Sequence, residues 1–173
     1  MRDRLIPAAL ASIGLALPGA APADVRLIEA GVICPRDSDG DLVDAPRTEA
    51  GQIRIVDEGL GFDLLTRTVP AMDDLSFGFR TELEPGVIAR EVTIVVTHPP
   101  TGEAGVIREE WDDVFAAGDA QLNLFTFEEA YEKIPGTWTF SIEVEGRTVV
   151  SVPFEITEDR RDEVERACFQ FLS

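Results

Sequence analysis

Three aspartates have a spacing that suggests a metal site. Asp37, Asp39 and Asp41 recur at every second position, as do the residues whose oxygens reach calcium in an EF-hand loop. The rest of that pattern is missing, because Leu42 stands in place of the turn glycine and Thr48 in place of the final glutamate. We therefore favour a solvated acidic loop, with a calcium site at Asp37, Asp39 and Asp41 as the alternative. No other cofactor is expected.

His98 is the only histidine, and it precedes Pro99 at the end of a predicted strand. A zinc site would have to take its other ligands from carboxylates, and nucleophilic catalysis would need a serine beside the imidazole. No serine of the chain lies in a Gly-x-Ser-x-Gly elbow. We expect the His98 ring to hydrogen-bond a turn, and we predict no catalytic residue.

An acidic cluster surrounds one tryptophan, in the run Glu109-Glu110-Trp111-Asp112-Asp113. Such a cluster suits an amine or a sugar, but a strand end with one buried ring is the favoured interpretation. Two carboxylates on opposite sides of a glycosidic bond would hydrolyse it. The enzymatic alternative is therefore a hydrolase of envelope glycans that uses Glu109, Glu110 or Asp112 as loop acids.

The N-terminus has the features of an export signal. Arg2 and Arg4 precede an apolar stretch over residues 5–17, and small residues occupy 21–23, so residues 1–23 are predicted to be a cleaved signal peptide. The stretch is too short for a membrane-spanning helix, which needs roughly 20 residues. We expect a periplasmic or extracellular protein with no stable membrane insertion after signal cleavage.

Cys34 and Cys168 are the only two cysteines. In an exported chain, two cysteines near opposite ends most simply form one disulfide. Two buried free thiols are the alternative.

The net charge of −18 excludes nucleic acid as a partner. Such a charge repels nucleic acid and anionic lipid headgroups and favours cationic partners. With 45% hydrophobic residues, the chain still has ample material for a folded core.

Several segments alternate between apolar and polar residues, as strands with one buried face do. The predicted inward sets are Ile53 and Ile55; Leu75, Phe77 and Phe79; and Val92, Ile94 and Val96. Residues 35–49 show no such period and are predicted to be a loop. Turn signals such as Pro99-Pro100-Thr101-Gly102 separate the strands. This spacing of short strands and turns predicts an all-β sandwich.

The clearest strands form a hairpin near the C-terminus. Trp138, Phe140, Ile142 and Val144 share one face before a turn at Glu145-Gly146, and Val150, Val152, Phe154 and Ile156 continue the alternation. Pro153 has no N–H for a ladder, so its strand is expected to be at an edge or bulged.

One helix is predicted over residues 157–173. Thr157 is its expected N-cap, followed by Glu158 and Asp159 at the positive end of the dipole. Its apolar face holds Val164, Ala167, Cys168, Phe171 and Leu172.

Three short elements carry a resemblance to a known family: Ala45-Pro46-Arg47-Thr48, His98-Pro99, and Pro135-Gly136-Thr137-Trp138-Thr139-Phe140. Over residues 45–156 the chain resembles a bacterial family of exported domains of unknown function. The resemblance implies an immunoglobulin-like antiparallel β-sandwich, here with a short C-terminal helix. It implies no activity.

The predicted organisation is a signal peptide (1–23), an N-terminal segment with an acidic loop (24–50), the β-sandwich (51–156) and the helix (157–173). The favoured function is a non-enzymatic module of the cell envelope that recognises an unknown protein partner or has a structural role. The alternatives are the glycan hydrolase and a calcium-dependent assembly module.

Overall fold

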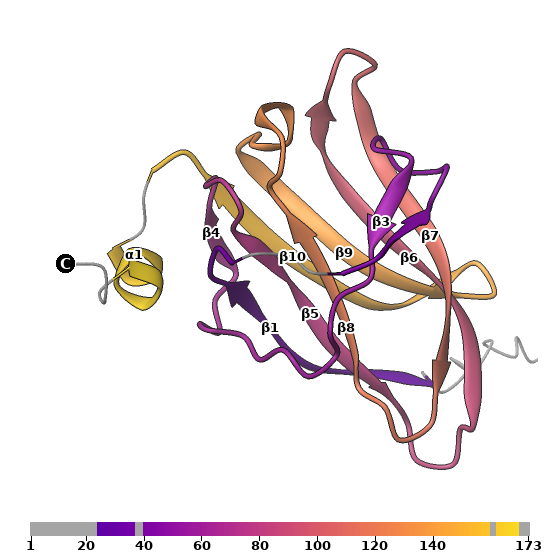
Figure 1. Cartoon of the computed structure of the whole chain (residues 1–173). Helices are drawn as coiled ribbons and strands as arrows, with labels where there is room; N and C mark the ends of the chain where they lie inside the picture. Colours follow the sequence, from indigo (N-terminus) through magenta and orange to yellow (C-terminus); the bar gives the residue numbers. More distant parts are fainter. Residues whose placement is uncertain (1–23, 37–39, 160–161, 170–173) are drawn as a thin grey trace, which may run out of the picture.

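Two sheets face each other across the core, and a small hairpin lies over one open side of the sandwich (Figure 1). The computed structural model describes residues 24–36, 40–159 and 162–169. One sheet has the order β1-β5-β8, with β1 (Val25–Ile33), β5 (Ser76–Leu83) and β8 (Gln121–Thr126). The other has the order β4-β10-β9-β6-β7, with β4 (Thr68–Pro70), β6 (Ala89–Thr101), β7 (Val106–Ala116), β9 (Gly136–Val144) and β10 (Arg147–Thr157). The hairpin consists of β2 (Leu42–Asp44) and β3 (Gln52–Arg54).

The strand order is that of an immunoglobulin-like sandwich. In that fold, strands A, B and E form one sheet and strands G, F, C and C′ the other. β1, β5 and β8 match the first set, and β10, β9, β6 and β7 match the second. All strand pairs are antiparallel except β4 with β10. The predicted fold class, an all-β immunoglobulin-like sandwich with one short C-terminal helix, is confirmed.

The core comes from the predicted inward faces of the strands. Leu75, Phe77, Phe79, Val92, Ile94, Val96 and the alternating residues of β9 and β10 are all buried. The prediction is wrong for Ile55, which is 52% exposed. The β2–β3 hairpin lies outside the two sheets, so the side chain of Ile55 has no second sheet to pack against.

The predicted hairpin of β9 and β10 is present, with Glu145 and Gly146 as its two-residue turn. Both turn residues have positive φ, at 51° and 71°, which is the combination that a type I′ turn needs. The position of Pro153 follows from the ladder. Glu155 donates its N–H to the carbonyl of Arg67, on the side away from β9. Because alternate residues of a strand direct their N–H groups the same way, an N–H at position 153 would also point away from β9, so the proline costs no β9–β10 hydrogen bond.

Two predicted boundaries are wrong. His98, Pro99 and Pro100 continue β6 past an irregular register and do not form a turn; the turn comes later, where Gly102 and Gly105 supply positive φ. Thr157 caps no helix, because it is the last residue of β10 and pairs with Pro70 of β4. At Thr157, pairing with β4 outweighs the capping preference. Residues 98–100 lie between the paired residues Thr97 and Thr101, and the Pro99 ring packs at Gly136, which has no side chain to exclude it.

The sandwich begins earlier in the chain than residue 51. β1 is an edge strand of the three-stranded sheet and pairs with β5 along its length. Residues 42–44, predicted to be part of a loop, form β2.

The predicted helix is present as α1, which covers Asp162–Phe169 among the described residues, and residues 157–159 are not part of it. Val164 is its buried anchor at 1% exposure, and Cys168 packs against the core. Phe171 and Leu172, like the predicted signal peptide, lie outside the described residues. Within the described part of the chain, no helix has the length and apolar character needed to cross a membrane.

Candidate functional site

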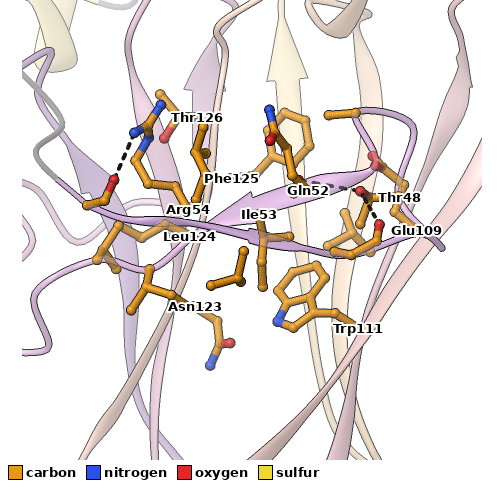
Figure 2. Close-up of a pocket in the computed structure, with 18 of the residues that line it drawn as sticks. Thr48, Gln52, Ile53, Arg54, Glu109, Trp111, Asn123, Leu124, Phe125 and Thr126 are labelled. Carbon is orange, nitrogen blue, oxygen red and sulfur yellow. Dashed lines mark hydrogen bonds between the residues drawn. The ribbon is translucent and has the colours of Figure 1, made fainter.

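A cleft of about 760 Å³ lies between the edge strands of the two sheets. β8 borders one side, β7 borders the other, and the β2–β3 hairpin crosses between them (Figure 2). Ile53 of the hairpin points into this cleft, towards Trp111 of β7 and the Asn123–Phe125 stretch of β8. The volume is within the range of roughly 300–1,000 Å³ that is usual for ligand sites.

A buried ion pair lies at one end of the cleft. Glu109 is 7% exposed and comes within 3.2 Å of His98 Nε2 through its Oε1 atom. Its other oxygen accepts the backbone N–H of Glu49 at 2.8 Å. The Glu49 carboxylate in turn accepts the hydroxyl of Thr101 at 2.6 Å. Four residues from three segments are therefore linked through polar contacts.

The His98 ring stacks on Trp138, with centroids 4.4 Å apart and an interplanar angle of 24°. Next to this stack, Gly136 has φ of 132°, and a Cβ there would lie 2.9 Å from the Pro99 ring. Only glycine suits both the backbone angle and the contact. The His98-Pro99 step and the Pro-Gly-x-Trp strand are therefore one packing unit.

The Ala45-Pro46-Arg47-Thr48 element reaches the same place. Thr48 donates both its N–H and its hydroxyl to the Ala45 carbonyl. This tight turn presents the N–H of Glu49 to Glu109. The three sequence elements that carry the family resemblance thus converge on the His98–Glu109 pair.

Both ring nitrogens of His98 are engaged, Nδ1 with the Pro99 carbonyl at 2.9 Å and Nε2 with Glu109. Burial lowers the pKa of His98, but Glu109, the Pro99 carbonyl and Glu49 raise it by more, so the net shift is upward. The geometry therefore favours the imidazolium form, in which neither nitrogen has a lone pair for a metal or for a general base.

This ion pair predicts a pH dependence that the single histidine makes easy to follow. The His98 ring protons in untagged protein should titrate by NMR with a midpoint above the ordinary histidine pKa of about 6.5. Because the folded pKa is raised, the pair's stabilisation is complete below about 6.5 and is lost as pH rises through the folded pKa. Urea unfolding at a series of pH values should show this loss.

Two variants test the cause. Glu109→Gln should lower the midpoint, because it removes the negative charge that raises the pKa of His98, while burial still lowers that pKa. Glu110→Gln should leave the midpoint unchanged, because Glu110 lies on the other face of β7 and pairs with Arg47. A wild-type midpoint at or below 6.5 would contradict the ion-pair assignment.

The acidic cluster around Trp111 lies within β7 and not in a loop or at a strand end. Glu109 and Trp111 pair with the core residues Val96 and Ile94, so they face the core. Glu110 and Asp112 alternate to the opposite face, where Arg47 contacts both at 2.9 Å. Hence Glu109 cannot converge with Glu110 or Asp112 on one glycosidic bond, and the two acids that share a face, Glu110 and Asp112, are both held by Arg47.

Two other carboxyl groups at the cleft have raised pKa values. Partial desolvation raises the pKa of Glu58 and of Glu132, although both accept backbone N–H groups that lower it. Glu58 binds the N–H of Leu122 and Glu132 binds that of Glu128, at opposite ends of β8. Six residues of strand separate these ends by about 20 Å. The two groups therefore do not form a catalytic pair either.

The predicted metal ligands are only partly within the described structure. Asp37 and Asp39 lie outside the described residues, and Asp41 is exposed, with its carbonyl accepting the N–H of Ile55. Among residues 24–36, 40–159 and 162–169, no group of three or more metal-binding side chains converges. A calcium site at Asp37, Asp39 and Asp41 stays a prediction.

Cys34 and Cys168 form a disulfide, with their Cα atoms 5.2 Å apart. The bond ties α1 to the segment that follows β1. Asp63 supports this segment by accepting both the N–H of Cys34 at 2.8 Å and the guanidinium of Arg36 at 2.5 Å.

Sequence reasoning missed the pairing of His98 with Glu109 and the cleft itself. The sequence signal for the His98–Glu109 pair was one histidine and one glutamate on consecutive predicted strands, each at a position where the neighbouring residues are apolar or alternate. The cleft has no sequence signal, because segments from residue 33 to residue 138 form it together.

Comparisons with known proteins give one family and one similar solved structure. An immunoglobulin-like protein of known crystal structure from Pseudomonas aeruginosa is similar at 18% sequence identity and a TM-score of 0.49, over 80% of this chain and 100% of that one. No curated protein matches significantly.

The family model "Domain of unknown function (DUF3859)" matches residues 22–156. The match starts before the resemblance predicted over 45–156, so it includes Cys34 and the three aspartates, while Cys168 lies beyond it. On this match over most of its length, the chain belongs to the DUF3859 family of domains of unknown function.

Proposed function

We propose that this protein is an exported recognition module that binds a partner protein in the cleft between β7 and β8 and does no catalysis. The observation that carries the proposal is an open cleft whose acidic groups are held in structural contacts. Glu109 is tied to His98 and Glu49, while Glu110 and Asp112 are tied to Arg47. Such a site is organised for contact, because each of the three candidate acids, Glu109, Glu110 and Asp112, is held in a structural contact.

Two features support export to the periplasm or beyond. The sequence of residues 1–23 has the pattern of a cleaved signal, and the Cys34–Cys168 bond is of a kind that persists in oxidising compartments. Fractionation of cells that make the full chain tests this step. We expect the envelope or medium fraction to hold a product that begins at Asp24, and an intact cytoplasmic product would contradict it.

Site-specific photo-cross-linking in the native host tests recognition. A photoreactive residue at Gln52, which is exposed and borders the cleft, should give a discrete adduct with another protein. The matched control is Ile88, which is 83% exposed and lies outside the cleft, and it should give none. The absence of any adduct from Gln52 would contradict the proposal.

The hydrolase alternative predicts a catalytic activity that the proposed function does not. If purified protein releases products from envelope glycans, and Glu110→Gln abolishes the release without lowering the melting temperature, the non-catalytic assignment is wrong.

A further inference from the structure

We infer that the free edge of β8 binds an extended, positively charged segment of the partner as an added strand. The inference rests on the proposed function, since it specifies the chemistry of the partner in the same cleft. Among the described residues, β8 is one of the two outer strands of its sheet, and β1 is the other. Unpaired backbone groups at such an edge form a template for another chain.

The direction of the β8 backbone groups follows from the residue after the strand. Phe127 donates its N–H to Leu75 and accepts the N–H of Asp74, and both partners lie on the β5 side. Because alternate residues of a strand direct their backbone groups the same way, the odd-numbered residues of β8 face β5. Leu122, Leu124 and Thr126 therefore direct theirs outward.

These outward groups are mostly unpaired. The N–H of Leu122 donates to the carboxylate of Glu58, and the carbonyl of Thr126 accepts the N–H of Glu128. Between them, the Leu122 carbonyl, both groups of Leu124 and the N–H of Thr126 have no partner among the described residues. Side-chain and turn contacts thus occupy both ends of the edge and leave unpaired groups at its centre, in the stretch towards which Ile53 points (Figure 2).

The facing edge of β7 is less available. Glu110 donates its N–H to the carbonyl of Arg47, and Val114 donates its N–H to the carboxylate of its neighbour Asp113. Of the outward N–H groups between Glu110 and Val114, only that of Asp112 has no partner among the described residues, whereas β8 offers those of Leu124 and Thr126.

A second, independent observation points to a ligand in the cleft. Asn123 is 6% exposed, pairs with the core residue Phe79 and borders the cleft. Its Nδ2 has no hydrogen-bond partner within the part of the chain that the structure describes. Figure 2 shows its side chain within the cleft, on the side opposite Trp111. Buried donors are almost always satisfied in folded proteins, so an acceptor on the bound segment would complete this one.

Charge identifies the kind of segment. Ten carboxylates and three arginines border the cleft. Glu58 binds the N–H of Leu122 at one end of β8, and Asp113 lies close enough to Glu58 for their charges to interact, while Glu128 and Glu132 lie beyond the other end. A strand with a cation at each end, about 20 Å apart, therefore matches both ends. A second copy of this chain, with its charge of −18, would be repelled.

The probe is a labelled peptide, acetyl-Lys-Thr-Val-Thr-Val-Thr-Lys-amide, and its counterpart has glutamate at both ends. Fluorescence anisotropy should show at least about tenfold tighter binding of the lysine peptide. NMR should show that the amide protons of Leu124 and Thr126 shift most. Equal binding of the two peptides, or no binding of the lysine peptide up to about 5 mM, would overturn the inference.

One pair of variants distinguishes the contribution of the Leu124 N–H to binding from that of the Leu124 side chain. Leu124→Pro removes an outward N–H that β5 does not use, so the fold should be retained while affinity falls at least about tenfold. Leu124→Ala keeps that N–H and should bind within about threefold of wild type. Unchanged affinity in Leu124→Pro, with the fold intact by NMR, would overturn the inference.

A second pair tests Asn123. Asn123→Leu and Thr81→Val each remove a buried polar atom without a partner, so each should raise the melting temperature by about 2–4 °C. Only Asn123→Leu should weaken peptide binding, because Thr81 does not border the cleft. Equal affinities in both variants would contradict the role of Asn123.

Other outcomes distinguish this inference from the proposed function. If Leu124→Pro still gives the Gln52 adduct in cells, the cleft recognises its partner without strand addition, and only the inference fails. If purified protein sediments as a dimer that Leu124→Pro abolishes, the occupant is a second copy, and the cationic partner is wrong.

Discussion

Loss of the Cys34–Cys168 bond should lower the free energy of unfolding by about 4–5 kcal/mol. The bond closes a loop of 134 residues, and in the chain-entropy model a loop of this length removes that much freedom from the unfolded chain. The folded state also depends on it. Among its described residues α1 has one buried side chain, Val164, and helices in proteins depend mostly on tertiary packing for their stability.

Urea unfolding with and without dithiothreitol measures this effect. The Cys34→Ala/Cys168→Ala variant should unfold at the same lowered urea concentration in both conditions, which separates loss of the bond from other effects of the reductant. Limited proteolysis should then cleave within or near α1 first. A midpoint that does not change when the wild-type bond is reduced would contradict the assigned role.

Phe77→Ala should destabilise the fold by about 3–5 kcal/mol. Phe77 is fully buried, and its ring lies within 6.0 Å of five other aromatic rings, centroid to centroid, from both sheets. These rings belong to Phe125, Phe127, Trp138, Phe140 and Phe154. Truncation would leave a cavity that this many rigid rings cannot easily fill. It would also remove the cross-strand partner of Phe125 on β8, and so loosen the side of the cleft.

Matched substitutions make this prediction specific. Phe77→Leu should cost less, about 1–2 kcal/mol, because most of the volume stays. Ile88→Ala should change stability by less than about 0.5 kcal/mol, since Ile88 is 83% exposed. Thermal and urea unfolding of the three variants tests the order. A similar loss in Phe77→Ala and Ile88→Ala would contradict the central role of the aromatic cluster.

The alternation of apolar and polar residues was enough to predict the sandwich and its main hairpin. Trp138, Phe140 and Val152 are buried as their period of two indicates, because side chains of a strand with one solvated face have only that arrangement. Cysteine content and an export pattern were likewise enough to predict the disulfide. These features depend on the local chain and on composition, and no knowledge of distant contacts is needed for them.

Local signals failed where distant strands compete with them. Thr157 has the residue type of a helix cap, yet β4 pairs with it. Pro99 and Pro100 signal a turn, yet β6 continues through them, because Gly136 leaves room for the Pro99 ring. Hydrogen-bonded neighbours are worth more than a local preference of about 1 kcal/mol, and those neighbours are far away in the sequence.

By itself, the sequence determined the fold class, the inward faces of the strands, the acidic charge and the two cysteines available for a bond. Only the tertiary structure decided the pairing of His98 with Glu109, the separation of Glu109 from Glu110 and Asp112 by the sheet, and the open edge of β8 beside the cleft. The physical reason is that strand order and register decide which side chains meet and which backbone groups stay unpaired. Both arise from contacts among segments far apart in the chain, which no local pattern encodes.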